Sequence, residues 1–86
     1  MPEDVLFKTM YQLTAQLKGA PLREDEKEGI AEGFSRASGS PYDKAISAIT
    51  GVLHCEPSLI FEKGEALESV KKMLQDIKAQ AEAMAR

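Results

Sequence analysis

His54 and Cys55 have the most obvious reactive potential in the chain, and they are adjacent in the sequence. A thiolate–imidazolium pair needs the two side chains in contact, whereas neighbours on a helix point about 100° apart. A structural zinc site takes four cysteine or histidine ligands, and the sequence has one of each. Two copies of the chain could pool four. We nevertheless predict no catalytic residue, no metal and no cofactor, and we interpret the pair as a helix end.

Other catalytic patterns are not found. A serine nucleophile would have to share the single histidine, and nothing local indicates such a triad. The sequence has neither a dinucleotide-binding glycine motif nor a phosphate-binding loop. These observations favour a protein that binds over one that catalyses a reaction.

Acidic residues crowd one short segment and form a second candidate site. Loop-type calcium sites alternate oxygen donors around a glycine turn, and this segment lacks that order. The carboxylates either complement the positive end of a helix dipole and face water, or they form a docking surface for a basic partner. Gly29 and Gly33, on one helical face, form a notch that serves internal packing or admits another backbone. The acidic residues are Glu24, Asp25, Glu26, Glu28 and Glu32.

The elements that must position these residues are helices. Apolar periodicity and capping signals predict an all-α protein, a compact bundle of three to four helices with a long C-terminal amphipathic helix. Pro2 suits a first helical turn, Gly19 a helix end, and Ser40 a helix cap. We expect a single helical domain over residues 1–86, with helices at about 2–18, 23–37, 41–55 and 65–86. The segment 57–63 could be helix, turn or short strand.

The last predicted helix has the most regular pattern. Its apolar residues alternate spacings of three and four, the 3.5-residue repeat of a coiled-coil seam. At about 22 residues and about 33 Å it would exceed the other helices in length. We expect its distal part to extend beyond the bundle and to pair with a second copy or a partner helix; coverage by the other helices is the alternative. The interface candidates are Leu67, Val70, Leu74, Ile77, Ala81 and Met84.

Charge and cysteine content limit the partners and the compartment. Fourteen acidic residues against eleven basic ones give a net charge of −3, so nucleic-acid binding is not favoured. One cysteine excludes an internal disulfide, which favours a reducing compartment. The N-terminus lacks a secretory pattern, and no apolar run is long enough to span a bilayer. We therefore expect a cytoplasmic protein with no membrane partner.

Residues 45–61 resemble the closing helix of repressor-type helix-turn-helix domains, in which an apolar helix ends in a turn followed by a short apolar plug. The resemblance covers about a fifth of the chain and uses common residue types. No recognition helix with exposed polar and basic residues precedes it, so we do not assign the chain to that family.

The sequence favours a non-catalytic protein–protein interaction module: a small cytosolic regulator, adaptor or chaperone-like subunit that presents helical faces to a partner and forms a homodimer. Two alternatives stay open. The first is a helix-turn-helix-type DNA-binding regulator with a basic face built from Arg23, Arg36, Lys44 and Lys63. The second is a small accessory subunit of an enzyme, which would need His54 in a cleft.

Overall fold

Helices make up nearly all of the protein. The computed structural model describes residues 1–85, and within them the chain forms five helices and no strand. In chain order these are α1 (Pro2–Lys18), α2 (Glu24–Arg36), α3 (Pro41–Leu53), α4 (Pro57–Ala66) and α5 (Glu68–Met84). The all-α prediction is confirmed, with five helices in place of three to four.

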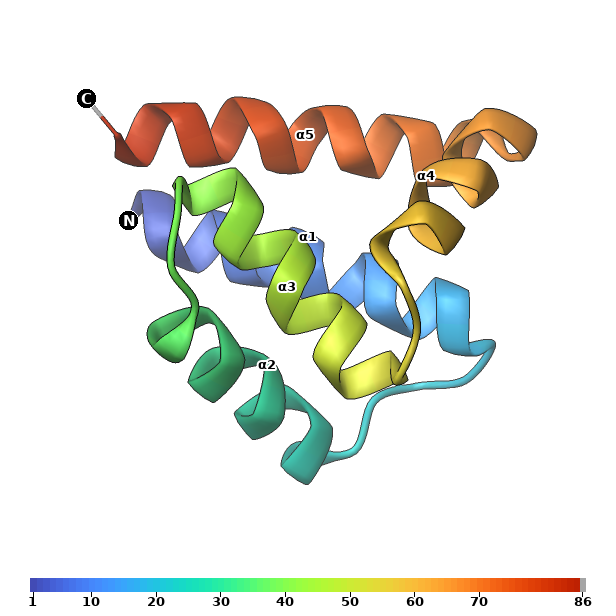
Figure 1. Ribbon diagram of the computed structural model, residues 1–86, viewed down its shortest axis with the longest axis horizontal. Coiled ribbons are helices and arrows are strands. Elements are labelled where there is room, and N and C mark those ends of the chain that lie inside the picture. The colour runs from blue at the N-terminus through green and yellow to red at the C-terminus, as the bar shows by residue number, and fades with distance from the viewer. Residues whose placement is uncertain (86) are drawn as a thin grey trace.

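The helices surround one core (Figure 1). α1 and α5 lie side by side and run in opposite directions, so the start of α1 and the end of α5 are at the same end of the molecule (Figure 1). α3 contacts both of them, and α2 packs against α3. α4 is a short helix that contacts α5 and α3 at the other end. The resulting body measures 31 × 27 × 21 Å.

The predicted capping signals set the end of α1 and the start of α3. Gly19 ends α1 in the left-handed region at φ 81°, and its N–H donates to the Ala15 carbonyl at 2.8 Å. Ser40 caps α3, because its hydroxyl oxygen accepts a hydrogen bond from the backbone N–H of Asp43 at 3.2 Å. α3 ends two residues earlier than predicted, since His54 turns the chain at φ 54°.

The prediction of one helix over residues 65–86 is wrong at its start. The segment 57–63 is helical, and α4 continues through Gly64 to Ala66. The break falls instead at Leu67, whose extended backbone (φ −125°) ends α4 and begins α5. Gly64 lies inside the corner between the two helices, where a Cβ atom would come 2.8 Å from Cδ1 of Leu74. The last helix ends at Met84, and Arg86 lies outside the described residues.

Every helix contributes apolar side chains to the core. α1 supplies Leu6, Met10 and Leu13, and α3 supplies Ala45, Ala48 and Ile49. The notch at Gly33 serves this internal packing, because a Cβ atom there would lie 3.2 Å from Cα of Ala48. The remaining core residues are Ile30, Ile60, Val70 and Ile77.

Within residues 1–85, none of the helices combines the length and the hydropathy that crossing a bilayer requires.

Candidate partner-binding groove

The seam predicted on the last helix is largely internal. Val70 and Ile77 are 0% exposed and Ala81 is 1% exposed, on the helix that lies along α1 (Figure 1). Leu74 and Met84 are half-buried, and Leu67 is 46% exposed at the α4–α5 corner. The three most buried members are therefore covered by their own chain, which corresponds to the alternative of intramolecular coverage.

The length argument for an overhanging last helix is also wrong. α5 has 17 residues, and α1, which packs against it, has 17 residues as well. The corner at Leu67 shortens the last helix, so the mismatch on which the predicted overhang depended does not arise. The length difference that suggested a homodimer through this seam is therefore absent.

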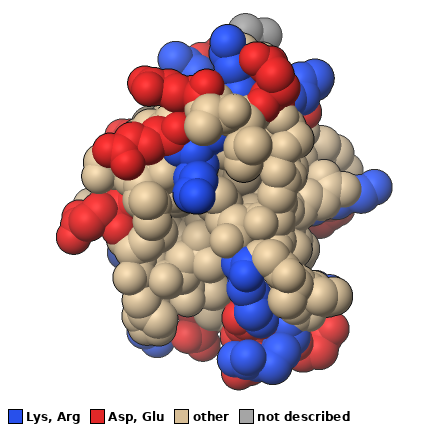
Figure 2. Space-filling model, turned by 90° about the vertical axis from the view of Figure 1, so that its right-hand side faces the viewer, with Lys and Arg blue, Asp and Glu red and all other residues tan. Residues whose placement is uncertain are grey.

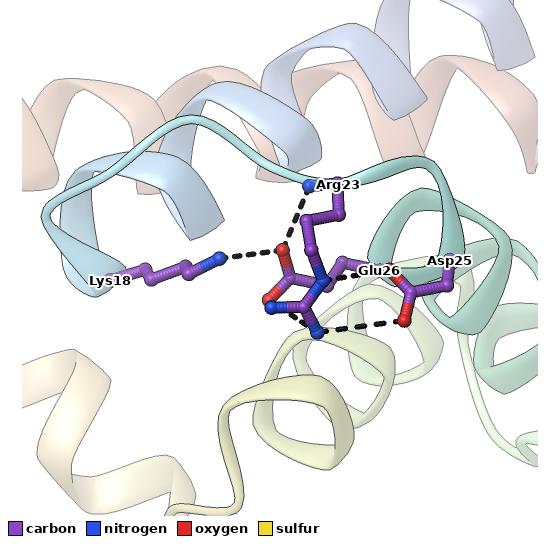
Figure 3. A network of polar contacts seen from close by, with 4 residues as sticks. All are labelled: Lys18, Arg23, Asp25 and Glu26. Carbon is purple, nitrogen blue, oxygen red and sulfur yellow. Dashed lines mark hydrogen bonds and ion pairs between the residues drawn. The ribbon is translucent and has the colours of Figure 1, made fainter.

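Two residues of the acidic cluster are engaged within the fold (Figure 3). Glu26 Oε1 accepts hydrogen bonds from the backbone N–H of Arg23 at 2.8 Å and from Lys18 Nζ at 2.6 Å. Asp25 Oδ1 accepts one from Arg23 Nε at 3.0 Å. The Arg23 backbone bond, followed by the Lys18 bond, lowers the pKa of Glu26, and the Arg23 side chain lowers the pKa of Asp25. These carboxylates fix the turn between α1 and α2.

The other three acidic residues lie along the surface of α2. Glu24 is 3.6 Å from Lys27 Nζ. Glu28 and Glu32 are exposed, and neither takes part in an ion pair formed within residues 1–85. The five residues therefore do not form one continuous free surface, and docking of a basic partner on them stays a prediction.

His54 and Cys55 lie at the end of α3, as the sequence indicated. His54 is exposed, and its backbone N–H donates to the Thr50 carbonyl. Burial, with a smaller contribution from the Glu56 carboxylate, raises the pKa of the Cys55 thiol. A raised pKa keeps the sulfur protonated, which is the reverse of what a nucleophile needs. In the described part of the chain, no group of three or more histidine, cysteine, aspartate or glutamate residues could hold a metal ion.

A hollow of about 470 Å³ lies between α4 and α5. Its apolar residues are Phe61 from α4, Leu74 from α5 and Tyr42 from α3. Phe61 is 40% exposed and is the one aromatic ring among the exposed large apolar residues of the described chain. We call this hollow the α4–α5 groove; it is lined by Tyr42, Phe61, Gly64, Glu65, Lys71, Leu74, Gln75 and Lys78.

Lysines border the groove on the α5 side. Lys71 and Lys78 are both exposed and are seven residues apart, which is two turns or about 10.5 Å along the helix axis. Neither takes part in an ion pair formed within residues 1–85, whereas Lys72 pairs with Asp76 at 2.7 Å. Glu65 is the one acidic residue that lines the groove. The groove thus combines an apolar floor with a basic border.

Tyr42 joins this groove to two smaller hollows. It lines a hollow of about 270 Å³ shared with Phe61, and another of about 250 Å³ shared with Lys78. Burial, followed by the charge of Asp43, raises the pKa of the Tyr42 phenol, so the hydroxyl stays neutral and able to donate a hydrogen bond. Asp43 lines the first small hollow and Glu82 the second.

A separate hollow of about 300 Å³ lies on the opposite flank of α4. Leu17, Leu53 and Leu59 line it, and Lys18 and Lys63 are its charged residues. Figure 2, which faces α4 and the nearby end of α1, shows a broad uncharged surface interrupted by Lys or Arg side chains, with acidic groups above it, below it and along its left edge. This hollow is smaller than the α4–α5 groove, and Lys18 is already bound to Glu26.

Part of the groove was visible in the sequence. Leu59, Ile60 and Phe61 form an apolar run, and Lys71, Lys72 and Lys78 lie close together in the sequence. The segment 57–63, for which helix, turn and short strand were all compatible with the sequence, is helical, with Ile60 buried and Phe61 exposed. Phe61 shares the groove with Tyr42 because α4 packs against α3, and the corner at Leu67, for which the sequence has no local signal, adds Leu74 and the lysines of α5.

The residues proposed for a DNA-binding face come from three different helices and one helix cap. Arg23 is bound by Asp25, and Lys44 Nζ lies 5.8 Å from the centre of the Phe34 ring. Arg36 ends α2, and Lys63 is on α4. The structure therefore does not gather these four side chains on one element.

Comparison with known proteins yields no match: none is found among protein-family models, curated proteins or solved structures.

Proposed function

We propose that this protein is a non-catalytic protein–protein interaction module whose partner binds in the α4–α5 groove. The observation that supports the proposal is Phe61, a large aromatic side chain 40% exposed at the border of a 470 Å³ hollow. Aromatic residues beside well-formed hollows carry much of the binding energy at protein interfaces. A regulator, adaptor or chaperone-like subunit would act through such a surface.

The surrounding residues suit this role. Leu74 and Tyr42 are half-buried and extend the apolar floor on both sides of Phe61. Tyr42 adds a hydroxyl that can meet a polar group of the partner, an arrangement common where one end of a ring is apolar and the other is wet. The groove runs between helices, which is the setting in which a partner helix is bound by its apolar face.

Affinity capture with a matched pair of variants tests the proposal. Phe61→Ala removes the aromatic ring from the groove, and Leu59→Ala removes a side chain of similar exposure (45% against 40%) from the opposite flank of α4. Both should leave thermal unfolding nearly unchanged, because surface substitutions alter stability by about 0.5 kcal/mol or less. We expect a partner in extracts of the source cell to be recovered by the wild type and by Leu59→Ala, but not by Phe61→Ala. Equal recovery by all three proteins would contradict the proposal.

A further inference from the structure

We infer that the α4–α5 groove binds an amphipathic helix of a partner protein, with an apolar side chain in the hollow beside Phe61 and two carboxylates, two turns apart, on Lys71 and Lys78. The inference rests on the function proposed above and adds the chemistry of the partner.

Charge complementarity is the first argument. Lys71 and Lys78 both line the groove and take part in no ion pair within residues 1–85. Together they exceed the single acidic residue there, Glu65, in a chain whose net charge is −3. Such a local excess of positive charge attracts carboxylates and repels basic partners.

Acidic residues in the two neighbouring hollows limit where the partner's charges can lie. Asp43 lines the small hollow that shares Phe61 with the groove, and Glu82 lines the one that shares Lys78. A carboxylate placed in either small hollow would meet a like charge. The partner's acidic side chains are therefore expected in the groove itself, on Lys71 and Lys78.

The spacing of the lysines favours a helix as the bound segment. Two side chains seven residues apart on α5 repeat after two helical turns, about 10.5 Å, and a partner helix lying along α5 repeats its own side chains with the same period. Residues 1–85 contain no strand whose edge could accept an extended peptide. A helix also allows the apolar anchor and the carboxylates to project from neighbouring sides.

A second copy of this chain fits the groove less well. The acidic residues Glu28 and Glu32 of α2 could face the lysines, but the exposed large apolar residues are Met1, Val5, Leu59, Phe61 and Leu67, none of which is in α2. A second copy docked through α2 would therefore leave the hollow unfilled. The contact would also join two different surfaces of the chain. Such a head-to-tail contact does not form a closed, two-fold symmetric dimer.

An anionic membrane surface fits less well too. The apolar part of the groove is concave and sized for side chains, at about 470 Å³, whereas a membrane-binding helix projects its apolar residues outward. The net charge of −3 also repels an anionic surface as a whole.

Binding of designed peptides to the full chain tests the inference. The probe is a fluorescein-labelled helix of about 18 residues, or five turns, with leucines on one face and two glutamates seven residues apart beside it. One control peptide has lysine in place of both glutamates, and a second has serine in place of the leucines. Fluorescence anisotropy at several salt concentrations gives the dissociation constants.

The protein variants separate the groove lysines from lysines in general. Lys71→Glu with Lys78→Glu reverses the border of the groove, while Lys72→Glu changes a neighbouring lysine that lies outside the groove lining. We expect the acidic peptide to bind the wild type and Lys72→Glu alike, and the double variant to bind it about tenfold or more weakly. The lysine peptide should show the opposite preference, and Phe61→Ala should weaken both.

Failure of this inference is distinguishable from failure of the proposed function. If capture of a cellular partner depends on Phe61 but not on Lys71 and Lys78, the groove is the binding site and the acidic helix is wrong. If no designed peptide binds, or the lysine peptide binds the wild type better, the inference is overturned. It is also overturned by Phe61-dependent self-association in sedimentation, or by binding to phosphatidylglycerol vesicles that needs both lysines.

Discussion

At the scale of single residues, the same side-chain type serves different purposes depending on what lies within its reach. Glu26 and Glu28 are two positions apart in one acidic run. The side chain of Glu26 is 13% exposed and holds the backbone of Arg23 and the ammonium of Lys18 (Figure 3), whereas Glu28 faces water. Composition alone treats the two glutamates alike, because it records their charge and not whether a hydrogen-bond donor lies within reach of the carboxylate.

Replacement of Glu26 by glutamine should change how stability depends on pH. The folded-state pKa of Glu26 lies below its ordinary value of 4.5. The ionised carboxylate therefore stabilises the fold fully above that ordinary value, and this contribution is lost as the pH falls through the folded-state pKa. We expect Glu26→Gln to have a lower melting temperature than the wild type near neutral pH, and the gap to narrow as the pH falls to about 3.

Thermal unfolding followed by circular dichroism across this pH range measures the gap. Glu28→Gln is the matched control: it makes the same change two residues away, at an exposed carboxylate without an ion pair in residues 1–85, and should melt like the wild type. A gap for Glu26→Gln that stays constant with pH would show that the carboxylate's charge does not matter.

At the scale of helices, close approach decides where glycine is needed. Gly33 lies where α2 meets α3, and a Cβ atom there would come 3.2 Å from the backbone Cα of Ala48. Gly51, in the interior of α3, has no such neighbour within 4 Å. Both residues lower helix propensity, but only the first lets two helices pack closely.

The two substitutions Gly51→Ala and Gly33→Ala should therefore change the free energy of unfolding by different amounts or in opposite directions. Gly51→Ala should raise the free energy of unfolding by about 0.5–1 kcal/mol, the usual gain for replacing an interior helical glycine. Gly33→Ala should show no gain or a loss, because its methyl group pushes against the Ala48 backbone. Urea unfolding at equilibrium measures both. Equal gains for the two variants would mean that the α2–α3 contact is looser than the structure shows.

At the scale of the whole molecule, the protein covers the seam that could have joined two chains. α1 has the length of α5 and lies antiparallel to it, which leaves Val70 and Ile77 fully buried (Figure 1). An apolar hollow of about 470 Å³ is left between α4 and α5. The surface available to a partner is consequently different from the one that periodicity suggested.

Substitutions along α5 should separate core from surface. Ile77→Ala should cost about 2–5 kcal/mol of unfolding free energy, because it leaves a cavity in the core. Leu67→Ala, at an exposed residue of the same predicted seam, should cost about 0.5 kcal/mol or less. Urea unfolding gives both values, and sedimentation at several concentrations should show the same mass for wild type and Leu67→Ala. A small loss for Ile77→Ala, together with a dimer that this substitution dissociates, would restore the intermolecular seam.

The sequence by itself determined the all-α class and most helix ends. Those features depend on residues close together in the chain: Ser40 on the N–H of Asp43, Gly19 on the Ala15 carbonyl, and apolar residues repeating along each helix. The tertiary structure decided the rest. Whether Ile77 faces its own chain or another, whether Glu26 is free, and whether Phe61 meets Tyr42 depend on contacts between distant segments. The physical reason is that periodicity shows that a side of a helix must be covered, but not by what.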